Sequence, residues 1–173
     1  LAVLKRVIVQ NIKDGGVAVL NATDPNVVAM APHCRGSVTY FALDRYHPVM
    51  ATHLALGRRA IYVEDGHLVA SEGTFVQRIA LAQIPITHGG AIGFQVENVM
   101  AAVAAASAIA LPWETIQKGL ARFENDANNA QGRFNLFTYR GATLIADYGH
   151  NPDAIAALVQ AVDNMPGKRR SVV

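Results

Sequence analysis

The chain has 173 residues, of which 51% are hydrophobic and 16% are charged, and its formal net charge is +2. This length and composition predict one globular domain, or one domain and part of a second. Because no lysine-rich tract alternates with aromatic residues, the small positive charge argues against nucleic acid as a partner.

No segment is predicted to cross a membrane. The longest apolar run, at residues 99–113, is dominated by alanine and falls short of the roughly 20 strongly apolar residues that a bilayer crossing needs. The first residues lack the basic start and the cleavage site of a signal peptide. The single cysteine cannot form an internal disulfide, in agreement with a reducing compartment. We therefore predict a cytoplasmic location.

The first part of the chain is predicted to alternate helices and strands. Residues 1–14 have apolar side chains at helical spacing and precede Gly15 and Gly16, which predicts a helix that ends at these glycines. There follow a buried strand at 17–20, a turn at 21–26, a short helix at 26–33, a strand at 37–43 and a loop at 44–48. In α/β sheets, turns at strand ends are where ligands bind.

Residues 59–84 alternate apolar and polar side chains as antiparallel hairpin strands do. A glycine-rich loop at 85–93 then precedes a predicted helix at 94–110. Its many alanines allow neighbouring elements to approach closely, so we expect this helix to be central. Pro112 is expected in the first turn of one more helix.

Residues 124–132 are polar and without periodicity, which predicts a linker with a domain boundary near residues 128–131. We therefore divide the chain into residues 1–130 and 131–173. The second part is predicted to contain two strands within 133–146, a helix that Asn151 caps and Pro152 begins, and a strand starting at residues 171–173. Strand, loop, helix and strand would form the opening βαβ unit of a doubly wound sheet.

Several catalytic motifs are absent from the sequence. There is no G-x-x-x-x-G-K-[ST] phosphate loop, no G-x-S-x-G nucleophile motif, and no partner that would complete a zinc site with His33 and Cys34. The segment "HGGAIG" resembles a phosphate loop only loosely, and a flexible loop that permits close packing is the alternative. We assign no catalytic and no metal-binding residue to this chain.

Two residues are candidates for binding the base and the phosphates of a nucleotide. Asn98 lies in the first turn of a predicted helix that is otherwise mostly apolar, and an amide offers the donor and acceptor that read an adenine edge. A helix cap or a satisfied core amide is the alternative. Arg133 follows the linker, and its planar guanidinium suits a phosphate or a carboxylate. An interdomain salt bridge would also explain it.

Two further candidates lie in the segment "IADYGHNPDAI". Asp147 ends an apolar run and is expected at the carboxyl end of a strand in a parallel sheet, where an aspartate can accept hydrogen bonds from ribose hydroxyls. His150 precedes a helix N-terminus, whose free N–H groups favour anions. For His150, a ligand contact and a hydrogen bond within the loop both fit.

Four segments, "LNATDP", "THGGAIGFQVENVMAAVAAASAI", "GRFNLF" and "ADYGHNPDAIAAL", occur in an order that resembles the Mur ligase superfamily, and within it the cyanophycin synthetase branch. The resemblance implies an α/β fold: the later half of a central ATP-binding domain followed by the first βαβ unit of a Rossmann-like C-terminal domain. It implies ATP-dependent addition of arginine to the side-chain carboxylates of poly-aspartate through an acyl phosphate. By motif, it implies that Asn98 contacts adenine, Arg133 the phosphates, and Asp147 the ribose or the hinge, with His150 in the same motif.

The resemblance also implies that ATP and magnesium are cofactors whose phosphate loop and magnesium ligands lie outside this chain, so that the chain alone is expected to be inactive. Thr23 stands where relatives often carry an acidic residue, which puts a polar role there in doubt. Two alternatives stay open: another Mur-type ligase, of the peptidoglycan-precursor or folylpolyglutamate type, or a non-catalytic nucleotide-binding module. An incomplete C-terminal sheet would expose a strand edge and favour a homo-oligomer.

Overall fold

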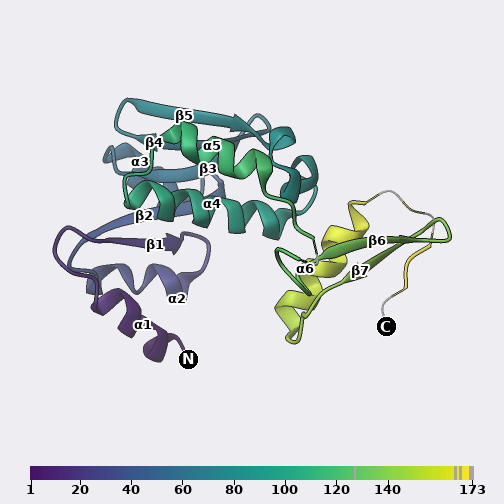
Figure 1. The fold of residues 1–173 in the computed structure, drawn as a ribbon. Helices are drawn as coiled ribbons and strands as arrows, with labels where there is room; N and C mark the ends of the chain where they lie inside the picture. The colour runs from purple at the N-terminus through teal and green to yellow at the C-terminus, as the bar shows by residue number, and fades with distance from the viewer. Residues whose placement is uncertain (127, 166, 168, 172–173) are drawn as a thin grey trace.

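The computed structural model describes residues 1–126, 128–165, 167 and 169–171 (Figure 1). The described part is a mixed α/β structure. Its α-helices are α1 (Ala2–Gln10), α2 (Pro25–Val28), α3 (Pro48–Ala55), α4 (Gly93–Ala108), α5 (Trp113–Arg122) and α6 (Pro152–Asp163). Its strands are β1 (Val17–Asn21), β2 (Ser37–Asp44), β3 (Ala60–Glu64), β4 (His67–Glu72), β5 (Phe75–Ala80), β6 (Asn135–Tyr139) and β7 (Ala142–Ala146).

The first five strands form one sheet in the order β1-β2-β3-β4-β5. Strands β1, β2 and β3 are parallel, with Val17 opposite Ser37 and Tyr40 opposite Ala60. Strands β3, β4 and β5 are antiparallel. The antiparallel segment predicted at residues 59–84 is therefore confirmed, and β3 joins it to the parallel part of the sheet.

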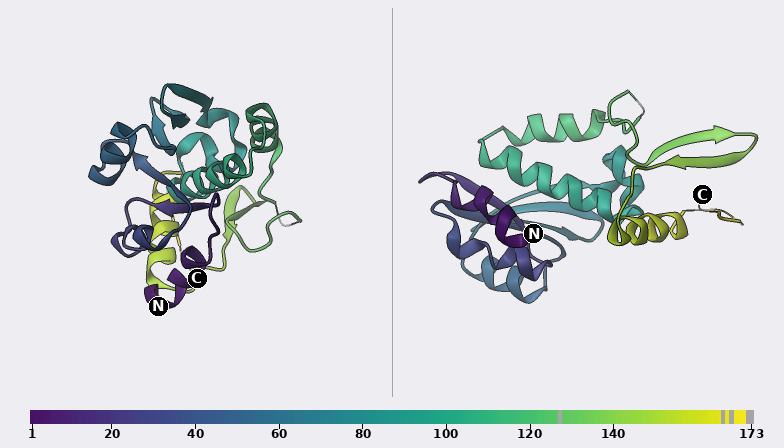
Figure 2. Two further views of the ribbon diagram at one scale, coloured as in Figure 1. Left: turned by 90° about the vertical axis from the view of Figure 1, so that its left-hand side faces the viewer. Right: turned by 90° about the horizontal axis from the view of Figure 1, so that it is seen from below.

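Helices cover both faces of this sheet (Figure 2). Helices α1, α2 and α3 cover one face, over a core that includes Leu20, Tyr40 and Met50. Helices α4 and α5 cover the other face, where α4 contacts four strands, β1 to β4. Met100 of α4 is fully buried. The expectation of a central helix is confirmed, because its small side chains let it lie close to several strands at once.

The first part of the chain differs from the prediction in several places. Helix α1 ends at Gln10, and Gly15, with φ 81°, belongs to a later turn. Helix α3 was not predicted: its eight residues lie between the predicted loop and the strand region that was expected to start at residue 59, and Pro48 begins it. Helix α4 begins at Gly93, so Asn98 lies in its second turn, not its first. Among the described residues, no helix is long and apolar enough to span a bilayer.

The remaining elements lie together at one end of the molecule, with the β6–β7 hairpin projecting away from the sheet (Figures 1 and 2). The two predicted strands and the helix with Asn151 as its cap are confirmed. The parallel setting of Asp147 is not: in the described part of the chain β7 pairs only with β6, and this pairing is antiparallel. The strand expected at residues 171–173, which would complete the βαβ unit, falls partly outside the described residues.

Candidate functional site

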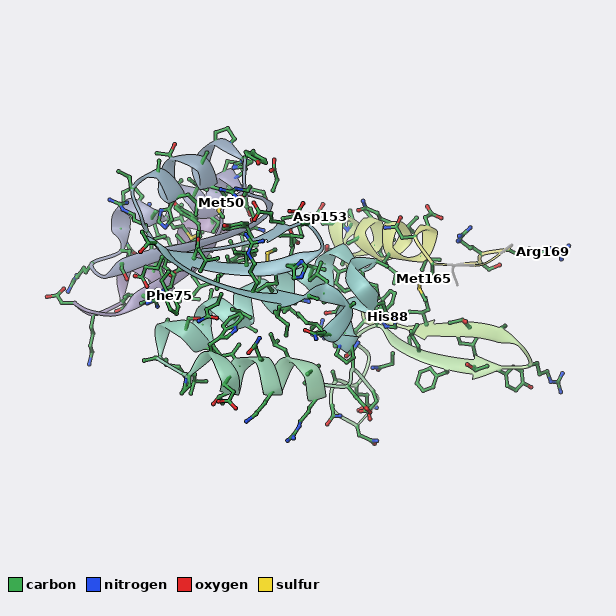
Figure 3. The ribbon with its side chains drawn as sticks, turned by 90° about the horizontal axis from the view of Figure 1, so that it is seen from above. Met50, Phe75, His88, Asp153, Met165 and Arg169 are labelled. Carbon is green, nitrogen blue, oxygen red and sulfur yellow. The ribbon has the colours of Figure 1, made fainter. Side chains whose placement is uncertain are left out.

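A small apolar cluster joins the hairpin and α6 to the N-terminal end of α4. Its buried members are Ile92, Phe134 and Ala161, and Phe94 packs against them. The rings of Phe94 and Phe134 meet edge to face, with centroids 5.5 Å apart and an interplanar angle of 72°. Figure 3 labels His88 and Met165 at this end of the molecule, and Met165 also packs on the cluster. We refer to this contact region as the junction.

Phe134 adopts an unusual backbone conformation at the junction. Its φ is 54°, in the left-handed region, although the side chain is aromatic and only 1% exposed. A non-glycine residue in this region costs on the order of 1–3 kcal/mol and persists only where surrounding contacts impose it. One such contact is a hydrogen bond in which the Phe134 N–H donates to Oδ2 of Asp147 at 2.9 Å.

Two asparagines hold the segment between α5 and β6. Asn135 is 2% exposed; its Oδ1 accepts from the Gly132 N–H at 2.7 Å, and its Nδ2 donates to the carbonyl oxygens of Ala130 at 3.0 Å and Asn125 at 3.3 Å. Asn125 in turn donates from Nδ2 to the Arg133 carbonyl oxygen at 2.6 Å. Neither asparagine was among the predicted site residues. The predicted linker is therefore pinned at both its ends to the start of β6.

Asp147 uses both carboxylate oxygens to hold backbone. Oδ2 accepts from Phe134, as above, and Oδ1 accepts from the Gly149 N–H at 2.7 Å. The Tyr148 N–H donates to the Gly132 carbonyl oxygen at 2.8 Å. These bonds bring the "GRFN" and "DYGHN" segments together. Each carboxylate oxygen can accept a second hydrogen bond, so Asp147 also has acceptor capacity for a ligand.

Three of the four predicted site residues, Arg133, Asp147 and His150, therefore lie in one loop cluster at the junction. The side chains of Arg133 and His150 are exposed. His150 Nδ1 lies 3.1 Å from the Tyr148 carbonyl oxygen, and its ring lies 5.2 Å from that of Tyr148. The hydrogen bond within the loop is thus present, and it leaves the other ring nitrogen of His150 free for solvent or a ligand.

The fourth residue, Asn98, is exposed on α4, where its Nδ2 donates to Gln95 Oε1 at 3.1 Å. It is neither the helix cap nor a core amide. Asn98 lies one helical turn beyond Phe94, so the two share a face of α4. Because Phe94 touches Phe134, this face leads to the loop cluster that carries Arg133. The preceding residue, Glu97, is partly buried, and burial raises the pKa of its carboxyl group.

A pocket of about 290 Å³ lies beside the junction, between Pro85–Gly90, the predicted linker and β6. His88 and Glu124 line it, and Phe134 forms part of its wall. Residues Pro85–Gly90 form 3-10 turns that are interrupted by a kink at His88 and Gly89, where φ is 49° and 69°. The hydroxyl of buried Thr87 lies within hydrogen-bonding distance of the carbonyl oxygens of Leu81 and Ile84, at 3.0 and 2.8 Å. In the part of the chain that the structure describes, no group of three or more His, Cys, Asp or Glu could hold a metal ion.

Residues 132–173 match the family described as Mur ligase, glutamate ligase domain. The whole chain is similar to cyanophycin synthetases, with 35% identity to that of Geminocystis herdmanii and 36% to that of Crocosphaera subtropica, and it covers 20% of each. The resemblance to the Mur ligase superfamily is confirmed. A UDP-N-acetylmuramate–L-alanine ligase of Pelobacter propionicus, another Mur ligase, is 31% identical over 84% of the chain and 29% of that protein.

The fold agrees with this family. The structure is similar to MurF from Acinetobacter baumannii, with a TM-score of 0.63 and 21% identity over 94% of this chain and 32% of that one. The predicted α/β fold class, similar to part of a Mur ligase, is confirmed, whereas the predicted βαβ unit extends beyond the described residues. The chain spans about a fifth of the length of the cyanophycin synthetases that it matches.

Proposed function

We propose that the chain is the part of an ATP-dependent amide-forming ligase that binds the nucleoside and guides the phosphates, and that this ligase adds arginine to the side-chain carboxylates of poly-aspartate. The similarity of the whole chain to cyanophycin synthetases carries this proposal. We place the domain boundary between residues 130 and 131, which the match of residues 132–173 to the Mur ligase family supports. The cytoplasm is the compartment that we propose.

The exposed groups around the junction fit a nucleotide. We propose that Asn98 contacts the adenine, Arg133 the phosphates, and Asp147 the ribose or the hinge, with His150 beside them. The exposed guanidinium of Arg133 suits phosphate oxygens, and the exposed amide of Asn98 offers a donor and an acceptor to a base. Magnesium would be held by residues outside this chain. When bound, ATP would supply the phosphoryl group that activates the acceptor carboxylate.

The chemistry asks for positioning and charge stabilisation. The acceptor carboxylate would take a phosphoryl group, with ADP as the leaving group, to give an acyl phosphate. The amine of the amino acid would then attack its carbonyl carbon, displace phosphate and lose a proton. Charge accumulates on the phosphoryl oxygens during such a transfer, and a fixed guanidinium stabilises it. Arg133 would fill this role, and Asp147 would hold the backbone that carries Arg133, through its bond to the Phe134 N–H.

The test is arginine incorporation by the full-length protein that contains this chain. Arg133→Ala and Asp147→Ala should each reduce ATP-dependent incorporation by at least about tenfold, which corresponds to roughly 1.4 kcal/mol of transition-state stabilisation. Arg140→Ala is the matched control, because Arg140 is also an exposed arginine and lies at the tip of the β6–β7 hairpin, which Arg133 precedes. Wild-type rates in both variants would refute the assignments.

A second candidate is a ligase of the same superfamily with another product, which the similarity to UDP-N-acetylmuramate–L-alanine ligases favours. Phosphate release with arginine, glutamate, alanine and diaminopimelate as alternative substrates separates the two. Nucleotide binding without phosphate release, whichever amino acid is added, would point to a non-catalytic module. The 173-residue chain alone is expected to release no phosphate.

A further inference from the structure

We propose that Phe134 is a positioning residue that sets the distance between the two ends of the nucleotide site, by anchoring the Arg133 segment to the helix that carries Asn98. This inference rests on the proposed function. Phe134 was not among the residues that the sequence singled out, and in this proposal it does not touch the nucleotide.

Burial separates Phe134 from its neighbour Arg133. The Phe134 side chain is 1% exposed and packs on Ile92, Phe94 and Ala161, whereas Arg133 is exposed. One residue thus points into the apolar cluster while the preceding one faces solvent. The aromatic side chain holds the segment to α4, and it leaves the guanidinium available to a ligand.

Hydrogen bonds make this anchor stiff. The Phe134 N–H donates to Asp147, and the Arg133 carbonyl oxygen, on the other side of the same peptide bond, accepts from Asn125 Nδ2 at 2.6 Å. The left-handed φ of 54° at Phe134 is held by these contacts and by the packing of the ring. A shift of the ring therefore moves the Arg133 backbone with it.

The anchor also has a fixed relation to the adenine end of the proposed site. Phe94, which the Phe134 ring meets edge to face, lies one helical turn before Asn98. The path from Asn98 to Arg133 thus runs through one turn of α4, one aromatic contact and one peptide unit. A ligand that contacts both residues gains from this prior order, because less conformational freedom is lost on binding. Removing the ring should weaken the binding of ATP more than that of the amino acid.

The experiment uses the full-length protein and the variants Phe134→Ala, Phe134→Leu and Phe137→Ala. Phe137 is the matched control, because it is a phenylalanine three residues beyond Phe134, on β6, but is 46% exposed. We expect Phe134→Ala to raise the Kd for a non-hydrolysable ATP analogue at least about tenfold, and Phe134→Leu to restore part of the affinity. The KM for arginine should stay within about twofold of wild type in both. Phe137→Ala should match wild type in both measurements.

Unchanged analogue affinity in Phe134→Ala or Phe134→Leu would overturn the inference, as would an equal rise in the analogue Kd and the arginine KM. If Phe134→Ala does not fold, Phe134→Leu and Phe94→Leu decide. Each should weaken analogue binding, and the double variant should weaken it by less than the product of the two effects, since both act on one contact. A wild-type protein that turns over no ATP with any amino acid would refute the proposed function itself. If the wild-type protein turns over ATP and the Phe134 variants bind the ATP analogue with unchanged Kd, only this inference is refuted.

Discussion

Asn135 offers the sharpest test of how the junction is held. The substitution Asn135→Ala removes three hydrogen bonds, one accepted from Gly132 and two donated to the carbonyl oxygens of Ala130 and Asn125. A neutral hydrogen bond contributes about 0.5–1.5 kcal/mol, and the side chain is only 2% exposed, so water cannot readily replace it. The three bonds together predict a loss of about 3 kcal/mol in the free energy of unfolding.

Urea unfolding of the 173-residue chain, followed by far-UV circular dichroism, measures this loss. A change of this size lowers the Tm of a chain of this length by roughly 6–12 °C. Asn128→Ala is the control, because Asn128 is exposed and takes part in the loop through its backbone N–H, which the variant keeps. Asn135→Asp should lose at least as much as Asn135→Ala, because it keeps the acceptor for Gly132 but places a buried carboxylate against the carbonyl oxygens of Ala130 and Asn125. A loss below about 1 kcal/mol in Asn135→Ala would refute the argument that this amide holds the linker.

Two further predictions concern the main sheet and its helices. A Cβ at Gly36 would lie 2.0 Å from the Gly16 carbonyl oxygen, so Gly36→Ala should lower the free energy of unfolding by about 1–3 kcal/mol in urea. In α5, a Cβ at Gly119 meets no atom within 4 Å, so Gly119→Ala should raise the free energy of unfolding by about 0.5–1 kcal/mol. A more stable Gly36→Ala than Gly119→Ala would contradict this prediction. Burial holds the pKa of His53 below its usual 6.5, so the unfolded chain binds a proton more readily than the folded one, and the free energy of unfolding should fall as the pH drops below about 6.5. His53→Gln should reduce that pH dependence and the exposed His88→Gln should not; equal slopes in both variants would rule out His53 as its source.

Local patterns predicted most elements of the fold. The alternation of residues 59–84 and the cap and proline at the start of α6 are properties of a few neighbouring side chains, and the structure confirms them. Helix α3 was missed for the converse reason. It has only eight residues, and its buried members, Met50 and His53, are identified by their contact with the sheet and not by a regular apolar spacing.

The site was predicted less completely than the fold. Arg133 was proposed because it follows the linker, and Asp147 because it ends an apolar run, and the structure brings the backbone of the first segment to the carboxylate of the second. The local sequence, however, does not predict that the Asn135 side chain donates to a carbonyl oxygen ten residues earlier, or that Phe134 has a left-handed backbone conformation. Both features follow from the packing of segments that are distant in the sequence, so periodicity carries no trace of them.

Asp147 shows how the structure changes the interpretation of a residue chosen from the sequence. A carboxylate at the end of a parallel strand would face a ligand with both oxygens, but this one lies at the end of an antiparallel hairpin and receives the N–H groups of Phe134 and Gly149. The carboxylate of Asp147 thus accepts hydrogen bonds that order the two loops that meet at the junction. A ribose hydroxyl could use only the remaining lone pairs, whose directions those two bonds determine. The two backbone hydrogen bonds of Asp147 therefore do not exclude the proposed ribose contact, because each carboxylate oxygen can accept a second hydrogen bond.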